Sequence, residues 1–360
     1  KKYYDKFSLR KKISIINEQS EYLEKKILEL MEENDSRKLE ICNLLDENND
    51  NKLQINRLLN ESNDLKCWSM QMFHEYYGLI DSNKKSIASL LRLLILKYYE
   101  GKMLDNEKKE VIDWLTRNSV RMYPYDFCNE YLPDDIEIYW DKEGWRYVLY
   151  SGKPVYFPKT YSDEHIKAYF SFLIMEQDKR SPHCYFTNQL NLNKDTVFID
   201  AGAAEGLIGL SVVQQVKCLY LIECDSLWIE PLQRTFRPYS NVQIIDKMVG
   251  NSNTDSMITL NSIITGKEQV VIKADVEGAE HDLLKGLDNV YLKSGSSLIL
   301  CAYHNQSDEE TIGSIFAKQG IPYEVSKGFV IPLLGEYEEP YLRKALVRCT
   351  IENNLKFKYI

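Results

Sequence analysis

The chain begins with a long stretch that contains neither Gly nor Pro. The first Gly is Gly78 and the first Pro is Pro124, although the 360 residues include 16 Gly and 10 Pro. Compact β and α/β domains need a turn about every ten residues, and turns rely on Gly and Pro. The stretch therefore predicts long helix, and it leaves the second half of the chain for the compact domain.

Apolar residues between Ile13 and Leu65 recur at the spacing of a coiled coil. Ile16, Leu23 and Leu30 lie seven residues apart on a background of Glu, Lys, Asn and Asp. This pattern predicts a coiled-coil helix over residues 1–67, followed by a helical adaptor over 68–130. A helix this polar has little to bury except against a partner, so we expect homo-oligomerisation or docking onto another protein. The alternative is a single long helix that lies on the rest of the chain.

Charge and cysteine content limit the partners and the compartment. The 45 Lys and Arg residues are outnumbered by 54 Asp and Glu residues, and because nucleic acid selects basic faces we expect no nucleic-acid partner. The longest apolar run, 90–96, contains Arg92 and falls short of the roughly 20 residues of a membrane span. The eight Cys show no CxxC spacing, which predicts reduced thiols, no metal framework and a cytoplasmic location.

Residues 131–360 are predicted to form a mixed α/β domain. In its first segment, 131–195, Ser162 begins a predicted helix that runs toward Gln177. From Thr196 onward, apolar runs of buried-strand type alternate with helical stretches, which predicts a mostly parallel sheet over 196–360. The predicted strands are a hairpin at 136–140, 145–150 and 155–157, buried strands at 197–199, 218–222, 242–245, 270–273 and 297–301, and closing strands at 323–326, 329–333 and 345–351, at least one of them antiparallel.

The first two strand ends carry candidate ligand-binding residues, because ligands of open α/β sheets bind at the carboxyl ends of the strands. After the first strand comes Asp200-Ala-Gly202-Ala203-Ala-Glu-Gly206, in which the two Gly allow close approach of backbone to a ligand. Glu223 ends the second strand, 21 residues after Gly202. A doubly wound sheet places there the carboxylate that binds two ribose hydroxyls, which indicates an adenosine-containing ligand.

The charge of this turn favours S-adenosylmethionine (AdoMet) over NAD. The turn reads G-x-x-x-G-x-x-G instead of G-x-G-x-x-G. Asp200 and Glu205 would repel a pyrophosphate, whereas they would attract a ligand that carries a sulfonium and an ammonium. At the end of the third strand, Asp246 is the candidate partner of the adenine amino group, with an ordinary solvated aspartate as the alternative.

A denser acidic cluster follows the fourth strand. Asp275, Glu277 and Glu280 surround Gly278 there, and carboxylates this close are costly unless they are solvated, paired or metal-bound. We assign no metal ligands, although Asp275, Glu277 and His304 could gather a divalent ion and leave metal dependence open.

Five motifs follow one another along the chain: Asp200-Ala-Gly202-Ala-Ala-Glu-Gly206, Glu223, Thr259-Leu-Asn261, Lys273-Ala-Asp275-Val-Glu277-Gly-Ala-Glu280 and Tyr303-His304. This set resembles the bacterial FkbM-type methyltransferases, which are AdoMet-dependent enzymes with the class I Rossmann-like fold. The resemblance spans about 150–350, and Asn261 and Ala302 depart from the family's usual acidic residues. It implies a Rossmann-like core over 196–360 and O-methylation of a hydroxyl on a saccharide or another small molecule.

The family also implies a setting and a catalytic step. The setting is bacterial glycan biosynthesis, with another glycan-assembly enzyme as a possible partner of the coiled coil. A methylated hydroxyl must lose its proton, and His304 is the predicted general base, with Asp275 or Glu280 as the competitor. The alternative function is a coiled-coil scaffold whose Rossmann-like domain binds a nucleotide without catalysis.

Overall fold

The computed structural model describes residues 91–186, 192–333 and 339–359, within a compact unit that runs from Leu91 to Ile360. The predicted coiled coil over 1–67 and the adaptor up to residue 90 lie outside the described residues. From there, residues 91–99 are helical and α3 covers Asn106–Arg117. Two short 3-10 turns follow, η2 (Asp126–Glu130) and η3 (Pro133–Asp135). Within the described ranges no helix combines the length and apolar character needed to cross a membrane.

The predicted hairpin and helix after it are confirmed. Strands β1 (Tyr139–Trp140), β2 (Arg146–Tyr150) and β3 (Lys153–Tyr156) form a small antiparallel sheet. The strand predicted to begin at residue 136 starts later because Ile136 ends η3. Helix α4 (Asp163–Glu176) begins at Ser162, whose side chain accepts a hydrogen bond from the His165 amide.

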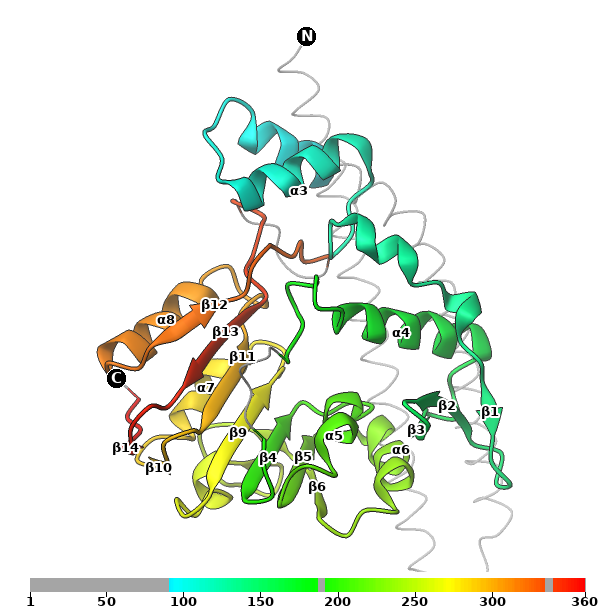
Figure 1. Cartoon of the computed structure of the whole chain (residues 1–360), viewed down its shortest axis with the longest axis vertical. Helices are drawn as coiled ribbons and strands as arrows, with labels where there is room; N and C mark the ends of the chain where they lie inside the picture. The colour runs from blue at the N-terminus through cyan, green and yellow to red at the C-terminus, as the bar shows by residue number, and fades with distance from the viewer. Residues whose placement is uncertain (1–90, 187–191, 334–338, 360) are drawn as a thin grey trace, which may run out of the picture. The chain divides into compact units, whose positions relative to one another are not determined.

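A seven-stranded sheet forms the centre of the domain (Figure 1), and it confirms the predicted mostly parallel α/β architecture. Its order is β12-β13-β11-β9-β4-β5-β6, and β13 runs antiparallel to both of its neighbours. The central strands are continuous apolar runs because helices cover both faces of the sheet. The strands are β4 (Thr196–Ala201), β5 (Cys218–Glu223), β6 (Val242–Asp246), β9 (Gln269–Ala274), β11 (Ser297–Cys301), β12 (Tyr323–Val325) and β13 (Leu346–Thr350).

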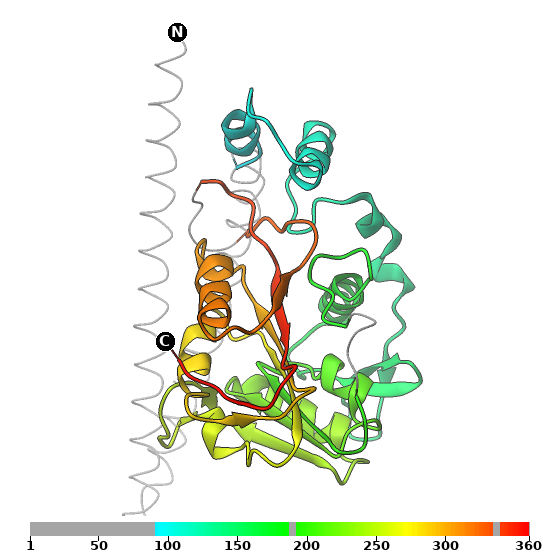
Figure 2. The ribbon, with the colours of Figure 1, turned by 60° about the vertical axis from the view of Figure 1, so that its left-hand side comes forward.

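Helices on the two faces of the sheet complete the layers (Figure 2). On one face, α7 (Glu280–Lys285) and α8 (Asp308–Lys318) share an apolar core with β4, β9, β11 and β13. The other face carries α5 (Leu207–Val212) and α6 (Ser226–Phe236). Smaller elements are η4 (Leu260–Ser262) and the strand pairs β7 (Met248–Val249) with β8 (Met257–Ile258) and β10 (Tyr291–Leu292) with β14 (Leu355–Lys356).

The closing strand predicted at 329–333 is wrong. Within the described part of this region, the segment forms no strand but an isolated bridge between Val330 and Arg343. The adaptor takes the backbone groups that a strand would need: the Phe329 amide donates to the Tyr125 hydroxyl at 2.7 Å, and the Ile331 amide donates to the Met122 carbonyl at 2.9 Å. These hydrogen bonds join residues about 200 positions apart, so a local sequence pattern could not predict them.

The direction of strand addition reverses between β4 and β9. From β4 the chain adds β5 and then β6 on one side, and from β9 it adds β11 on the other. Such a switch point leaves a crevice outside the carboxyl ends of the two central strands, where the following loops diverge. The predicted motifs at Asp200 and Asp275 therefore flank one crevice.

Candidate functional site

A cavity of about 690 Å³ occupies this crevice. The turn 202–205 after β4, residues 222–225 at the end of β5 and residues 275–277 after β9 line it. Helix α4 supplies a further wall with Tyr169, Phe172 and Glu176. A cavity of this size at a switch point is the expected place for a small-molecule ligand.

The lining of this cavity is strongly acidic. Six carboxyl groups face two lysines: Glu176, Glu205, Glu223, Asp225, Asp275 and Glu277 against Lys247 and Lys273. Lys273 is itself neutralised, because its ammonium lies 3.0 Å from the buried carboxylate of Asp200. A dianionic pyrophosphate would be repelled here, whereas a cationic ligand would be attracted.

Gly202 brings the two strand-end loops into contact. Its φ is +72°, and a Cβ at this position would lie 1.8 Å from the carbonyl oxygen of Asp275. The Gly202 carbonyl also accepts a hydrogen bond from the Lys273 ammonium at 2.7 Å. The absence of a side chain at Gly202 therefore fixes the distance between the β4 and β9 loops, and both Gly202 and Ala203 line the cavity.

We expect Gly202→Ala to destabilise the protein by about 3 kcal/mol or more, because it combines a positive φ with a clash against backbone. Chemical denaturation gives the free energy of unfolding. Gly320→Ala is the matched control, since Gly320 also has a positive φ but no heavy atom lies within 4 Å of its Cβ position. Equal losses in the two variants would contradict the role given to the loop contact.

Gly206 packs against α6, so the structure gives it a packing role, and its assignment as a ligand-binding residue stays a prediction. It begins α5 with a φ of +77°, and a Cβ there would meet Phe236 Cε2 at 2.6 Å and Leu232 Cδ2 at 2.8 Å. In the described part of the chain Gly206 is not among the residues that line the cavity. The Gly is needed because α5 and α6 approach closely at this point.

Glu223 and Asp246 end neighbouring strands but differ in position. The Glu223 carboxylate lines the cavity and is held by two backbone amides, those of Ala204 and Asp225, each at 2.8 Å. Asp246 is exposed and does not line the cavity, whereas the next residue, Lys247, does. The structure therefore favours the solvated alternative for Asp246.

Asp275 is the centre of a polar cluster at the end of β9. Its carboxylate accepts a hydrogen bond from the Tyr185 hydroxyl at 2.8 Å and lies 3.3 Å from His304 Nε2. Burial by itself would raise the pKa of Asp275, but His304 and Lys273 hold it below its usual range. Asp275 is therefore an ionised hydrogen-bond acceptor on the cavity wall.

His304 and Glu280 lie behind Asp275, and the geometry does not favour either as the general base. Neither residue lines the cavity among the described residues, and Glu280 Oε1 accepts a hydrogen bond from the Val276 amide at 3.2 Å. His304 Nδ1 lies 3.0 Å from Glu280. Burial lowers the pKa of His304, but Asp275 and Glu280 outweigh it and raise the pKa to about 10. An imidazole that is already protonated cannot accept a proton.

The charged His304 predicts a pH-dependent stability. Because its pKa is higher in the folded protein than the usual 6.5, it stabilises the fold fully below about pH 6.5 and ceases to do so as the pH rises through about 10. We expect the free energy of unfolding of wild type to exceed that of His304→Gln at pH 6, and the difference to shrink at pH 10. A difference that grows with pH would show that His304 is neutral.

Two sets of three side chains could hold a metal ion in the described part of the chain. One is Asp275, Glu280 and His304, and the other is His183, Asp275 and Cys301, with ligand atoms within 4.8 Å of one another. Glu277 belongs to neither set: its Oε2 lies 3.6 Å from His304 Nε2, but its side chain is 91% exposed. Neither set tests whether a metal binds, so the expectation of no metal ligand stays a prediction.

Three cavity residues were not among the predicted site residues, although the charge of Glu205 entered the argument for AdoMet: Glu176, Glu205 and Tyr169. The Tyr169 hydroxyl donates to Glu205 at 3.1 Å, and the Tyr123 hydroxyl donates to Glu176 at 2.5 Å. Burial raises the pKa of Glu205 to about 7 and that of Glu176 to about 8. The position of Glu205 within the glycine turn could have identified it as a site residue from the sequence. Tyr169 and Glu176 line the cavity only because α4 crosses the crevice.

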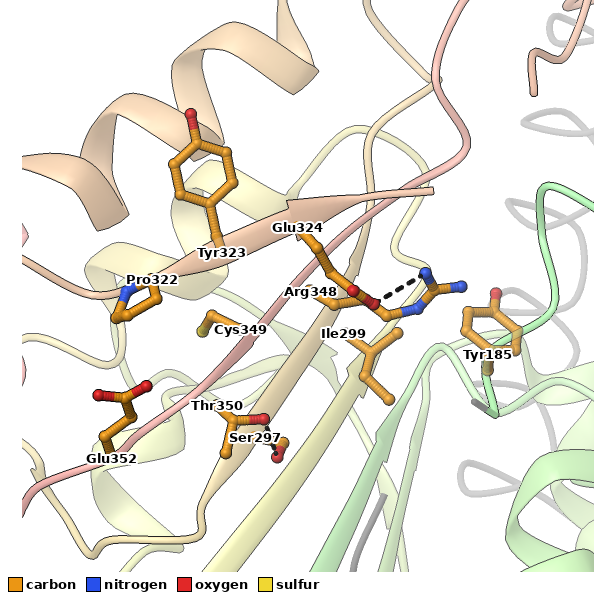
Figure 3. Close-up of a pocket in the computed structure, with 10 residues that line it drawn as sticks. All are labelled: Tyr185, Ser297, Ile299, Pro322, Tyr323, Glu324, Arg348, Cys349, Thr350 and Glu352. Atoms are coloured by element: carbon orange, nitrogen blue, oxygen red, sulfur yellow. Dashed lines mark hydrogen bonds and ion pairs between the residues drawn. The ribbon is translucent and has the colours of Figure 1, made fainter. Parts of the chain in front are cut away.

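A second cavity of about 250 Å³ lies against β11, β12 and β13 (Figure 3). Arg348 and Glu324 face each other in it with a 3.5 Å ion pair, and the hydroxyls of Ser297 and Thr350 are 3.1 Å apart. Tyr185 lines both cavities. None of the predicted site residues lines this second cavity, whereas several line the cavity at the switch point, which is therefore the candidate site.

No protein-family model and no curated protein matches the chain. Many solved structures do match it, including the following three, all at low sequence identity. An FkbM methyltransferase from Methylobacillus flagellatus is 18% identical with a TM-score of 0.35, and the match covers 54% of this chain and 56% of that one. A precorrin-6y C5,15-methyltransferase from Geobacter metallireducens is 14% identical with a TM-score of 0.33, over 46% and 83%. An rRNA methylase from Streptococcus thermophilus is 14% identical with a TM-score of 0.32, over 45% and 90%.

These similarities leave the family of this chain open. The resemblance to FkbM-type enzymes therefore stays a prediction. The expectation that nucleic acid is not a partner likewise stays a prediction.

Proposed function

We propose that the chain is an AdoMet-dependent methyltransferase that O-methylates a hydroxyl group. The observation that carries this proposal is the acidic cavity at the switch point, with six carboxyl groups around the glycine turn. The resemblance to FkbM-type enzymes adds a saccharide of bacterial glycan biosynthesis as the acceptor class. A cytoplasmic location and a role of the N-terminal segment in oligomerisation or docking belong to the same proposal.

The residues of the cavity fit AdoMet by their chemistry. Glu223, fixed by two amides, keeps lone pairs free for two vicinal hydroxyls of a ribose. Gly202 and Ala203 let the turn approach the ligand, and the net negative lining suits a ligand with a sulfonium and an ammonium. Asp200 acts indirectly, because it is buried against Lys273 beneath the turn.

Asp275 is the residue that we propose binds and orients the acceptor hydroxyl. When bound, AdoMet would supply a methyl carbon attached to a positively charged sulfur, and this carbon would be open to attack by the oxygen of an acceptor hydroxyl. Asp275 is the only one of the three predicted catalytic residues that lines the cavity within the described ranges, and its ionised carboxylate can accept a hydrogen bond from that hydroxyl and then its proton. Because its pKa is low, we assign most of its effect to orientation of the hydroxyl.

Labelled AdoMet tests the proposal directly. The full-length protein is incubated with methyl-labelled AdoMet and with bacterial glycan fractions or an RNA pool, and the labelled species is identified. Label in a saccharide supports the proposal, whereas label in RNA alone overturns the acceptor class. Binding of AdoMet without transfer to any pool would favour the alternative of a non-catalytic scaffold. An EDTA-treated sample in parallel measures the dependence on metal.

A further inference from the structure

We propose that Glu205, together with Tyr169, distinguishes the positively charged AdoMet from its neutral product S-adenosylhomocysteine (AdoHcy). This inference deepens the proposed function and rests on it. It gives a role to a buried carboxyl group that neither the glycine turn nor the ribose-binding carboxylate requires.

The position of Glu205 suits the recognition of a cation. Glu205 is the last residue of the turn 202–205 that follows β4; it lines the cavity and is only 6% exposed. The Tyr169 hydroxyl donates to Glu205 Oε2 at 3.1 Å. The Tyr169 ring stacks on Trp228 with 5.7 Å between the ring centroids, and both rings line the same cavity. A carboxyl group beside two aromatic rings is a favourable environment for an organic cation.

Among the described residues no Lys, Arg or His forms an ion pair with Glu205. Lys273 of β9 attracts the ionised form, but its ammonium is paired with Asp200 at 3.0 Å. Asp200 of β4 and Glu176 of α4 carry further acidic groups near Glu205. Burial outweighs the hydrogen bond from Tyr169 and raises the pKa of Glu205 to about 7. A cation in the cavity would therefore ionise Glu205 and release its proton near neutral pH.

The charge of the ligand changes during the proposed reaction. The sulfonium of AdoMet becomes a neutral thioether when the methyl group leaves, and the electron pair of the broken bond stays on the sulfur. Without the sulfonium, the ionised form of Glu205 loses its stabilisation and takes a proton from water. The cavity then holds AdoHcy less tightly than AdoMet, which favours release of the product.

Titration calorimetry on the full-length protein tests this role. AdoMet and AdoHcy are titrated at pH 7 in two buffers of different ionisation enthalpy, with wild type, Glu205→Gln, Tyr169→Phe and the control Glu310→Gln, an exposed carboxyl on α8. We expect wild type to bind AdoMet about tenfold more tightly than AdoHcy, and Glu205→Gln to lose that preference by weakening AdoMet alone. Tyr169→Phe, which keeps the ring, should lose part of the preference for AdoMet. Glu310→Gln should keep the full preference.

The proton balance gives an independent readout. AdoMet binding to wild type should release a proton below pH 7 and strengthen by up to about tenfold per pH unit there, whereas AdoHcy binding should not. A preference for AdoMet that persists in Glu205→Gln, or an equal loss for both ligands, overturns the role of Glu205. If wild type binds neither ligand, the proposed function itself fails. If Glu205→Gln does not fold, an unchanged preference in Tyr169→Phe is the result that overturns the inference.

Discussion

Lys273→Met is expected to lower the free energy of unfolding by about 3–5 kcal/mol, because it leaves the buried Asp200 without a counter-charge. The Lys273 ammonium lies 3.0 Å from Asp200, and both side chains are almost fully buried beneath the glycine turn. Burial by itself would lower the pKa of Lys273, but Asp200 and Asp275 raise it, which keeps the ammonium charged. Denaturant unfolding monitored by circular dichroism measures the loss.

Two further variants separate this buried pair from a general effect of losing a lysine. The double variant Asp200→Asn with Lys273→Met should recover much of the stability, since neither charge then remains buried. Lys285→Met removes an exposed partner of Asp282 and should cost less than about 1 kcal/mol. A double variant that is no more stable than Lys273→Met would contradict this account.

Asp275→Asn is expected to reduce kcat for methyl transfer about 100-fold, because the neutral amide accepts a hydrogen bond from the acceptor hydroxyl, and so orients it, much less strongly than the carboxylate does. The shape of the side chain is kept, and the Tyr185 hydroxyl can still donate to the remaining oxygen. We therefore expect a change in AdoMet affinity of less than about threefold. Single-turnover kinetics with saturating AdoMet, alongside calorimetric binding, measures the two effects separately.

The matched control for this variant is Asp134→Asn, an exposed aspartate in η3. It should leave both kcat and AdoMet affinity unchanged. His304→Gln provides a second comparison: it removes the charge behind Asp275, so it should lower kcat less than Asp275→Asn does. Full activity of Asp275→Asn would remove Asp275 from the reaction, and an inactive His304→Gln beside it would return the catalytic role to His304.

Local patterns were sufficient for the elements of the sheet. The apolar runs around Val197, Cys218 and Val270 became β4, β5 and β9 because a strand buried on both faces needs a continuous apolar run. The helix start at Ser162 was equally local, since one side chain caps it. The segment 329–333 has a similar composition, but its hydrogen bonds go to Tyr125 and Met122, and no pattern within the segment records that.

The candidate site, too, was predicted in part from the sequence and decided in part by the fold. The sequence alone determined that acidic and glycine-rich loops follow the strands, because strand ends are marked by a change from apolar to polar residues. Only the tertiary structure decided which of these residues reach the cavity: Asp275 lines it, whereas Gly206 packs against Phe236 and His304 is charged behind Asp275. Burial and the distances between charges set these roles, and both depend on contacts between residues far apart in the chain. For the same reason the charge of Glu205 could be noted from the sequence, but its burial in the cavity wall beside Tyr169 of α4 depends on the fold.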